Sequence, residues 1–181
     1  MVDTVSKTRQ VDEIRRCARD PIYFFKNYVR VPHPIRGTVP FNTYPFQDEC
    51  VKAFLEHRFV IVNKSRQLGL STLAAAYAAW LLMFFKNKEI IIMATKLNVA
   101  QNFVRKVKFA IKNVPSWLVI PKLAKDNDRT LTLGPPSNSR IEAIPTAQDA
   151  GRSEALSLLI VDEAAHVPDF EELWKGLYPT L

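Results

Sequence analysis

The chain has 181 residues, 48% of them hydrophobic and 24% charged, which is typical of one globular domain that buries a sizeable core. Lysine and arginine number 25 against 18 acidic residues, and the resulting net charge of +7 favours a polyanionic partner such as nucleic acid. The longest apolar run, residues 73–85, is too short to span a bilayer, the N-terminus has no apolar signal segment, and Cys17 and Cys50 form no metal motif. We therefore expect a cytoplasmic protein without membrane contact.

The N-terminal region predicts an arm, one short helix and a loop. Residues 1–20 are polar with mixed charge, as in a loose arm or a short helix. Asp20 suits a helix N-cap and Pro21 the first helical position, so we expect a helix to about residue 29. Its buried side would consist of Ile22, Phe25 and Val29. Residues 31–43 hold three prolines and a glycine and predict a loop.

From residue 45 onward, apolar strands alternate with helices. The expected order is a helix at 45–57, a buried strand at 59–62, a loop at 64–70, a buried helix at 71–85, a buried strand at 89–94, a helix at 98–113, a hairpin with arms at 129–133 and 140–145, and a buried strand at 158–161. This order predicts an open, largely parallel α/β sheet, and ligands of such sheets bind beyond the carboxyl ends of the strands.

The helix at 98–113 has one apolar and one basic side. Its expected core positions are Ala100, Phe103, Val104, Val107, Ile111 and the following Val114. Its basic residues are Arg105, Lys106, Lys108 and Lys112. They could contact DNA, but a solvated helix face is the simpler explanation.

The loop after the first strand follows the pattern of a phosphate-binding loop without its usual lysine. It consists of Lys64, Ser65, Arg66, Gln67, Leu68, Gly69, Leu70, Ser71 and Thr72. In the standard pattern G-x-x-x-x-G-K-[ST], Leu70 stands where the lysine belongs and Lys64 where the first glycine belongs. Gly69 still allows the backbone to approach phosphate oxygens, and Ser71 keeps the hydroxyl that would hold Mg²⁺. The helix start that follows favours an anion.

Two other cations can replace the missing lysine. A loop that curls around phosphates brings its first residue near its last, so Lys64 can reach the β- and γ-phosphates of a nucleotide. Arg66 adds a second cation with bidentate geometry. The alternative is a strand-loop-helix corner whose charges are only solvated. The pattern favours nucleotide binding by the 64–72 loop.

Two carboxylates follow the last predicted strand. The apolar run at 158–161 would carry Asp162 and Glu163 to its carboxyl end, beside the phosphate loop. We expect Asp162 to hold Mg²⁺ and Glu163 to polarise a water for in-line attack on ATP. An acidic turn after a core strand is the alternative. The loop and the acidic pair together predict a Mg²⁺-dependent ATPase.

These segments, together with Tyr44–Gln47, Ala94–Lys96 and Leu159–Ala165, resemble the large terminase subunit of tailed phages, in its T4-like branch. That family has deviant phosphate loops whose lysine stands at the start, which matches Lys64. The resemblance implies a P-loop NTPase of the RecA-like additional-strand type, with a mostly parallel central sheet flanked by helices. The implied function is ATP hydrolysis, with Mg²⁺, that drives double-stranded DNA into a procapsid.

The resemblance also implies partners and two further site residues. The partners are the portal protein, the small terminase subunit and other copies of the chain in a ring, in the cytoplasm of the infected bacterial host and transiently on the procapsid. Gln47 would read adenine, because a glutamine amide both donates and accepts. Arg152 would act on the nucleotide of a neighbouring subunit. The alternatives are a surface helix residue for Gln47 and an ordinary loop arginine for Arg152.

The same resemblance suggests a domain division and leaves two other functions open. Residues 1–43 would form an arm and a lid-like region, and residues 44–181 an ATPase core that is truncated before the family's coupling strand and nuclease domain. A helicase-like, nucleic-acid-stimulated ATPase is one alternative function, although Leu70 argues against the common helicases. The other is a catalytically weak binding fragment, which the missing coupling strand favours.

Overall fold

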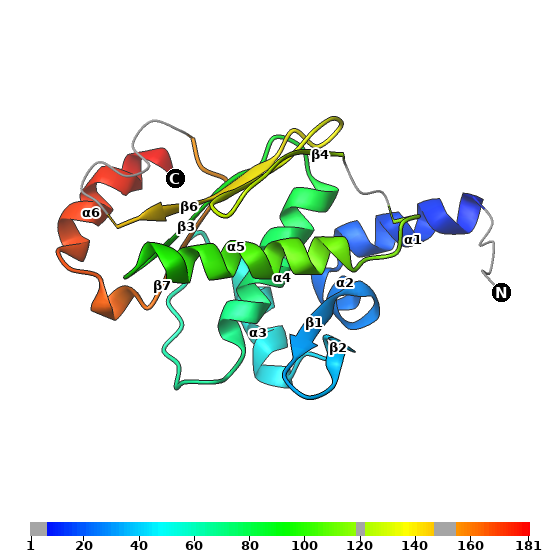
Figure 1. Ribbon diagram of the computed structural model, residues 1–181, viewed down its shortest axis with the longest axis horizontal. Coiled ribbons are helices and arrows are strands. Elements are labelled where there is room, and N and C mark those ends of the chain that lie inside the picture. Colours follow the sequence, from blue (N-terminus) through cyan, green and yellow to red (C-terminus); the bar gives the residue numbers. More distant parts are fainter. Residues whose placement is uncertain (1–6, 119–121, 147–154) are drawn as a thin grey trace.

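The computed structural model describes residues 7–118, 122–146 and 155–181. Its centre is a five-stranded sheet in the order β4-β5-β6-β3-β7. The strands are β3 (Glu89–Ala94), β4 (Leu123–Asp126), β5 (Thr130–Leu133), β6 (Arg140–Pro145) and β7 (Leu158–Asp162). Figure 1 shows α5 (Leu97–Lys112) running across one face of this sheet, with the N-terminal helices at one end of the molecule and α6 (Phe170–Leu177) at the other.

The sheet is mixed, and the expectation of a largely parallel sheet is wrong. β3 pairs in parallel with β6 and β7, whereas the β4–β5 and β5–β6 pairs are antiparallel. The predicted hairpin is confirmed, since the short turn between β5 and β6 leaves no room for a crossover and the two arms must run antiparallel. β4, which the sequence did not predict, adds a further antiparallel strand to this hairpin.

Alternation along β3 divides the core between the two faces of the sheet. Ile90 and Ile92 are fully buried in the cluster formed with α4 (Leu70–Phe84) and α5. Met93 is equally buried but belongs to the opposite cluster, with Leu173 and Leu177 of α6. Helices therefore cover both faces of this strand, which explains its unbroken apolar sequence.

The predicted helices lie within a residue or two of their expected places. α2 (Pro21–Tyr28) begins after Asp20, whose carboxylate accepts a hydrogen bond from the Tyr23 N–H at 2.9 Å. Of the predicted core residues, Phe25 and Val29 are buried as expected, whereas Ile22 is only half-buried. Phe24, which was not predicted, is also fully buried. The core positions predicted for α5 and its end are all buried, namely Ala100, Phe103, Val104, Val107, Ile111 and Val114. No helix within the described ranges is long and apolar enough to cross a membrane.

The N-terminal arm is a helix that docks on the core. α1 (Lys7–Arg19) decides between the two expectations for this region. The Trp80 Nε1–H of α4 donates to the Cys17 carbonyl oxygen of α1 at 2.8 Å, and Cys17 itself is fully buried. This buried hydrogen bond ties α1 to the helix that follows the 64–72 loop.

Several short elements were not predicted. The region expected to be a loop at 31–43 contains a two-stranded antiparallel sheet, β1 (Arg30–His33) and β2 (Gly37–Pro40). Its prolines are tolerated because each strand of a two-stranded sheet has an edge that needs no ladder partner. After β7 the chain forms the 3₁₀ turn η1 (Ala164–His166), α6 and the 3₁₀ turn η2 (Tyr178–Thr180).

The prediction of a strand at residues 59–62 is wrong. These residues form no strand and are exposed, Ile61 to 97%. Figure 1 shows the connection from α3 (Pro45–Glu56) to α4 as an open loop that swings away from the sheet. Phe59 contacts the rings of Trp174 and Tyr178. A parallel strand needs neighbours for its backbone groups, and the described sheet ends at β7 without including this segment.

Candidate functional site

The 64–72 loop ends at a left-handed glycine that starts α4. Gly69 has φ 69° and ψ 12° and is the N-cap of the helix, and Gln67 also has a positive φ of 64°. A positive φ suits glycine, which has no Cβ to clash, and it turns the chain sharply into the helix. The leading N–H groups of α4 are thus presented to the loop, an arrangement that attracts anions.

The two residues predicted to hold Mg²⁺ lie in direct contact. The Ser71 hydroxyl in the first turn of α4 donates to Asp162 Oδ2 at 2.8 Å, although 91 residues separate them in the chain. Asp162 is the last residue of β7 and pairs in register with Ala94, the last residue of β3. The carboxyl ends of two parallel strands therefore meet the start of α4, as the sequence predicted. A hydroxyl and a carboxylate oxygen are the kind of ligands that Mg²⁺ takes.

Glu163 follows Asp162 in an unusual backbone conformation. Its φ of 57° and ψ of 40° are left-handed, and it caps η1. Such a conformation is uncommon for a residue with a side chain and is found preferentially at functional sites. The side chain is exposed, next to the Ser71–Asp162 pair in sequence. A carboxylate in this place is free to accept a hydrogen bond from a water molecule.

The two cations of the loop are available to a ligand. Lys64 and Arg66 are exposed, and within the described ranges neither has a hydrogen bond or an ion pair. Ser65 and Leu68 are exposed as well. Leu70, in contrast, is partly buried and packs against the main core. The position of the standard lysine is thus used for packing, and the free cations lie earlier in the loop.

Gln47 is buried between α3 and the loop. It is 2% exposed, its Oε1 accepts from the Tyr44 N–H at 3.1 Å, and its Nε2 donates to the Leu68 carbonyl oxygen at 2.9 Å. The expectation of a surface helix residue therefore does not hold. Reading adenine would use the second hydrogen of Nε2 and the remaining lone pair of Oε1, because one of each is already engaged.

A cavity of about 570 Å³ adjoins this point. Its walls come from the β1–β2 hairpin, the start of α3, the end of the 64–72 loop and α5. Tyr44 and Phe46 lie on its wall as a stacked pair, with ring centroids 5.7 Å apart and an angle of 7° between planes. A planar aromatic ligand could extend such a stack, while the loop holds attached phosphates.

Arg30 and Lys106 also line the cavity, and sequence reasoning placed neither residue there. Both residues are partly buried, and in the described part of the chain neither side chain forms a hydrogen bond or an ion pair. Lys106 belongs to the basic side of the predicted helix, but the sequence alone did not tell which of these cations faces a cavity. Arg30 had no signal in the sequence, because the strand that carries it was expected to be a loop.

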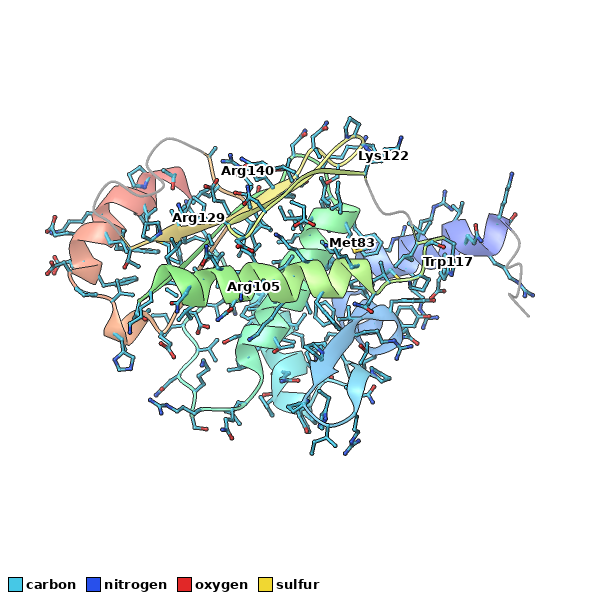
Figure 2. All side chains as sticks on the ribbon, in the orientation of Figure 1. Met83, Arg105, Trp117, Lys122, Arg129 and Arg140 are labelled. Atoms are coloured by element: carbon cyan, nitrogen blue, oxygen red, sulfur yellow. The ribbon has the colours of Figure 1, made fainter. Side chains whose placement is uncertain are left out.

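The rest of the basic side of α5 is largely occupied. Lys108 and Lys112 form ion pairs with Asp126 of β4 at 2.7 and 2.9 Å, and their hydrogen bonds lower the pKa of that carboxyl below its usual value. Arg105, labelled on α5 in Figure 2, is exposed and donates to Asn102 at 2.7 Å. The four residues therefore do not form one free face for DNA. Arg152 lies outside the described residues.

Comparison with known proteins identifies the family. The crystal structure of the HK97 bacteriophage large terminase has a similar fold, with a TM-score of 0.70 at 20% sequence identity. The match covers 90% of this chain but 35% of that one, so the chain spans about a third of the length of that terminase. Residues 61–179 match the family described as terminase large subunit, T4likevirus-type, N-terminal. The chain therefore belongs to this family of large terminase subunits and carries its N-terminal region.

Proposed function

We propose that the chain binds ATP with Mg²⁺ where the 64–72 loop, α4 and β7 meet, and hydrolyses it as part of a phage DNA-packaging motor. The observation that carries this proposal is the 2.8 Å contact between Ser71 and Asp162. It brings a hydroxyl at a helix N-terminus together with a carboxylate at a strand end, and the loop that leads into the same helix carries the two exposed cations Lys64 and Arg66. Family membership supports the same function.

Each residue of the site has a distinct role in this proposal. Ser71 and Asp162 hold Mg²⁺, which neutralises charge on the β- and γ-phosphates when bound. Lys64 and Arg66 bind phosphate oxygens in place of the missing lysine. Glu163 orients the attacking water and accepts its proton. The remaining loop residues, namely Ser65, Gln67, Leu68, Gly69, Leu70 and Thr72, surround the phosphates with their backbone.

The nucleoside lies in the adjoining cavity under this proposal. The stacked Tyr44–Phe46 pair offers a flat apolar wall for a base. Gln47 keeps its predicted role as adenine reader only through its second N–H and its free lone pair. Arg30 and Lys106 add positive charge to the same cavity, which suits the polyanionic ligand.

At the level of the whole motor, several features stay proposals. We propose that the fold is that of a P-loop NTPase of the RecA-like additional-strand type. We also propose double-stranded DNA, the portal protein, the small terminase subunit and a ring of like chains as partners, on a procapsid in the infected bacterium. Arg152 would complete a neighbour's site in that ring. The runner-up is a weakly catalytic binding fragment, favoured by the 59–62 segment that stands outside the sheet.

Nucleotide titration with an Asp162→Asn variant tests the central contact. We expect the parent to bind ATP in a Mg²⁺-dependent way, and Asp162→Asn to bind Mg²⁺-ATP about tenfold or more weakly, because a charged ligand is lost. Calorimetry with and without EDTA measures both. Asp128→Asn, on the exposed β4–β5 turn, is the matched control and should not change binding.

Two outcomes would decide against parts of the proposal. If Asp162→Asn kept the parent's Mg²⁺ dependence, the metal would be held elsewhere. If the parent bound Mg²⁺-ATP tightly yet released no phosphate in a turnover assay, alone or with DNA, the binding fragment would replace the ATPase as the better description of this chain.

A further inference from the structure

The end of the 64–72 loop is attached to the protein through one buried side chain. Residues 61–69 are all exposed, and in the described part of the chain the only hydrogen bond to the backbone of residues 61–68 comes from Gln47 Nε2, to the Leu68 carbonyl. The other end of the same amide accepts from the Tyr44 N–H at the start of α3. Gln47 therefore links a helix start to the phosphate loop.

The hydrogen bond from Gln47 to the Leu68 carbonyl also sets the direction of the Gly69 N–H group. In a trans peptide the C=O and N–H groups point in opposite directions. The peptide between Leu68 and Gly69 is trans, since the structure's cis peptide bond lies elsewhere. Fixing the Leu68 oxygen toward Gln47 thus turns the Gly69 N–H away from Gln47. It also keeps a carbonyl oxygen, which would repel phosphate, out of the loop.

The packing at Gly69 fits the same role. A Cβ built on Gly69 would lie 3.0 Å from Gln47 Nε2, and the residue has a positive φ. The amide therefore lies directly on the glycine backbone, so that it limits how residues 68 and 69 can move. Only a residue without a side chain allows this contact.

We infer that Gln47 is a positioning residue that holds the phosphate loop in its binding shape, before any base is bound. This inference rests on the proposed nucleotide function and goes beyond it, because it assigns Gln47 to the phosphate end of the ligand. A base reader and a positioning residue differ in a measurable way. Loss of the first harms only nucleotides with the right base, whereas loss of the second harms every phosphate ligand equally.

Gln47→Glu is the sharpest substitution. Glutamate has the same length and still accepts from the Tyr44 N–H, and a carboxylate is favourable at a helix start, so α3 keeps its cap. It cannot donate to Leu68, and it places a negative oxygen against that carbonyl. Gln47→Met has the same length without charge and serves as the second variant if Gln47→Glu does not fold. Gln10→Glu on α1 makes the same substitution outside α3 and the loop, and it serves as the matched control.

The binding test compares ATP, GTP and inorganic tripolyphosphate, each with Mg²⁺, by calorimetry. We expect Gln47→Glu and Gln47→Met to weaken all three by the same factor, roughly three- to tenfold, as for a lost hydrogen bond. The preference for ATP over GTP should not change. Weaker ATP binding with unchanged tripolyphosphate binding would overturn the inference in favour of adenine reading. Unchanged binding of all three would overturn both roles.

A second measurement does not depend on nucleotide. The hydrogen exchange of the Thr72 N–H reports on the loop end, because this group donates to the Gly69 carbonyl oxygen at 3.1 Å. Its exchange should be several-fold faster in Gln47→Glu than in the parent, while exchange of residues 49–56 stays the same. Equal exchange of the Thr72 N–H in both proteins would refute the inference even if the parent bound nucleotide. Faster exchange in Gln47→Glu, together with a parent that binds no nucleotide, would instead refute the proposed function and leave the link itself intact.

Discussion

The two halves of the 64–72 loop differ in how the protein holds them. The second half is fixed at two points, since Gln47 binds the Leu68 carbonyl and Ser71 binds Asp162. The first half, residues 64–67, is exposed and has no hydrogen bond within the described ranges. The proposed metal ligand Ser71 therefore lies on the preformed half, in contact with the second ligand Asp162 of β7, and the proposed phosphate cations lie on the unsupported half.

This difference predicts that the two halves contribute differently to metal binding and phosphate binding. The preformed half can hold Mg²⁺ without reorganisation, so it should set the geometry of the reaction. The unsupported half must lose conformational freedom when it closes on phosphates, at a cost of about 1–2 kcal/mol per ordered backbone residue. Lys64 and Arg66 must therefore offset an ordering cost that a standard loop lysine, placed in the first turn of a helix, does not carry.

The largest effect is expected from Glu163, which follows Asp162, the partner of the preformed half. Glu163→Gln should lower the turnover number by about 10²- to 10⁴-fold, because the amide cannot accept a proton from water. ATP affinity should stay within about twofold of the parent, since binding uses the loop. Steady-state phosphate release and calorimetry measure the two quantities. A parent-like turnover number would mean that another residue activates the water.

A smaller effect is expected on the unsupported side. Lys64→Ala should weaken Mg²⁺-ATP binding at least about tenfold, since it removes a charge-assisted contact to phosphate. The exposed Lys86, at the other end of α4, provides the control Lys86→Ala, which should not change binding. If Lys64→Ala bound ATP as tightly as the parent, the comparison between the halves would be broken, because the first half would have no role in binding.

Proteolysis can sharpen the comparison without any substitution. Trypsin should cleave the free protein after Lys64 and Arg66, because these residues are exposed and unsupported. Mg²⁺-ATP at ten times its dissociation constant should slow this cleavage roughly tenfold, since it binds the closed loop only. Cleavage after Lys86 should not change. Equal protection of both sites would indicate a general effect on folding rather than loop closure.

The smallest effect is expected from the cavity wall. Lys106→Ala should weaken ATP binding about threefold, because a partly buried cation near a polyanion contributes modestly and is screened by salt. The loss should shrink as the salt concentration rises. Arg105→Ala on the exposed side of the same helix is the control. A salt-independent loss would point to packing instead of charge.

Local sequence patterns correctly predicted the elements whose apolar pattern fits only one kind of secondary structure. The run in β3 is apolar on both faces and could only be a buried strand, and α5 carries a clear helical repeat. The meeting of Ser71 with Asp162 was also predictable, since parallel strands bring their carboxyl ends to one edge of a sheet.

The parts that were not predicted depend on partners elsewhere in the chain. The run at 59–62 is as apolar as β3, but the described sheet does not include it. Its apolar composition therefore led to the wrong prediction of a strand. The β1–β2 hairpin escaped notice because proline and glycine usually mark loops. The engagement of Gln47 at both ends of its amide could not be read from sequence, since it depends on the exact path of the loop.

The exposed segment at 59–62 also has a practical consequence. Ile61 is 97% exposed, and Phe59, Val60 and Val62 are also exposed in part. The last strand of the described sheet, β7, has one described neighbour, β3. An apolar, β-branched stretch near an open sheet edge is the usual starting point of intermolecular β-pairing. Concentrated solutions of this chain should therefore scatter light and lose protein on storage. Replacing Ile61 by lysine is the conservative way to keep the protein soluble for crystallisation, because this side chain is almost fully exposed.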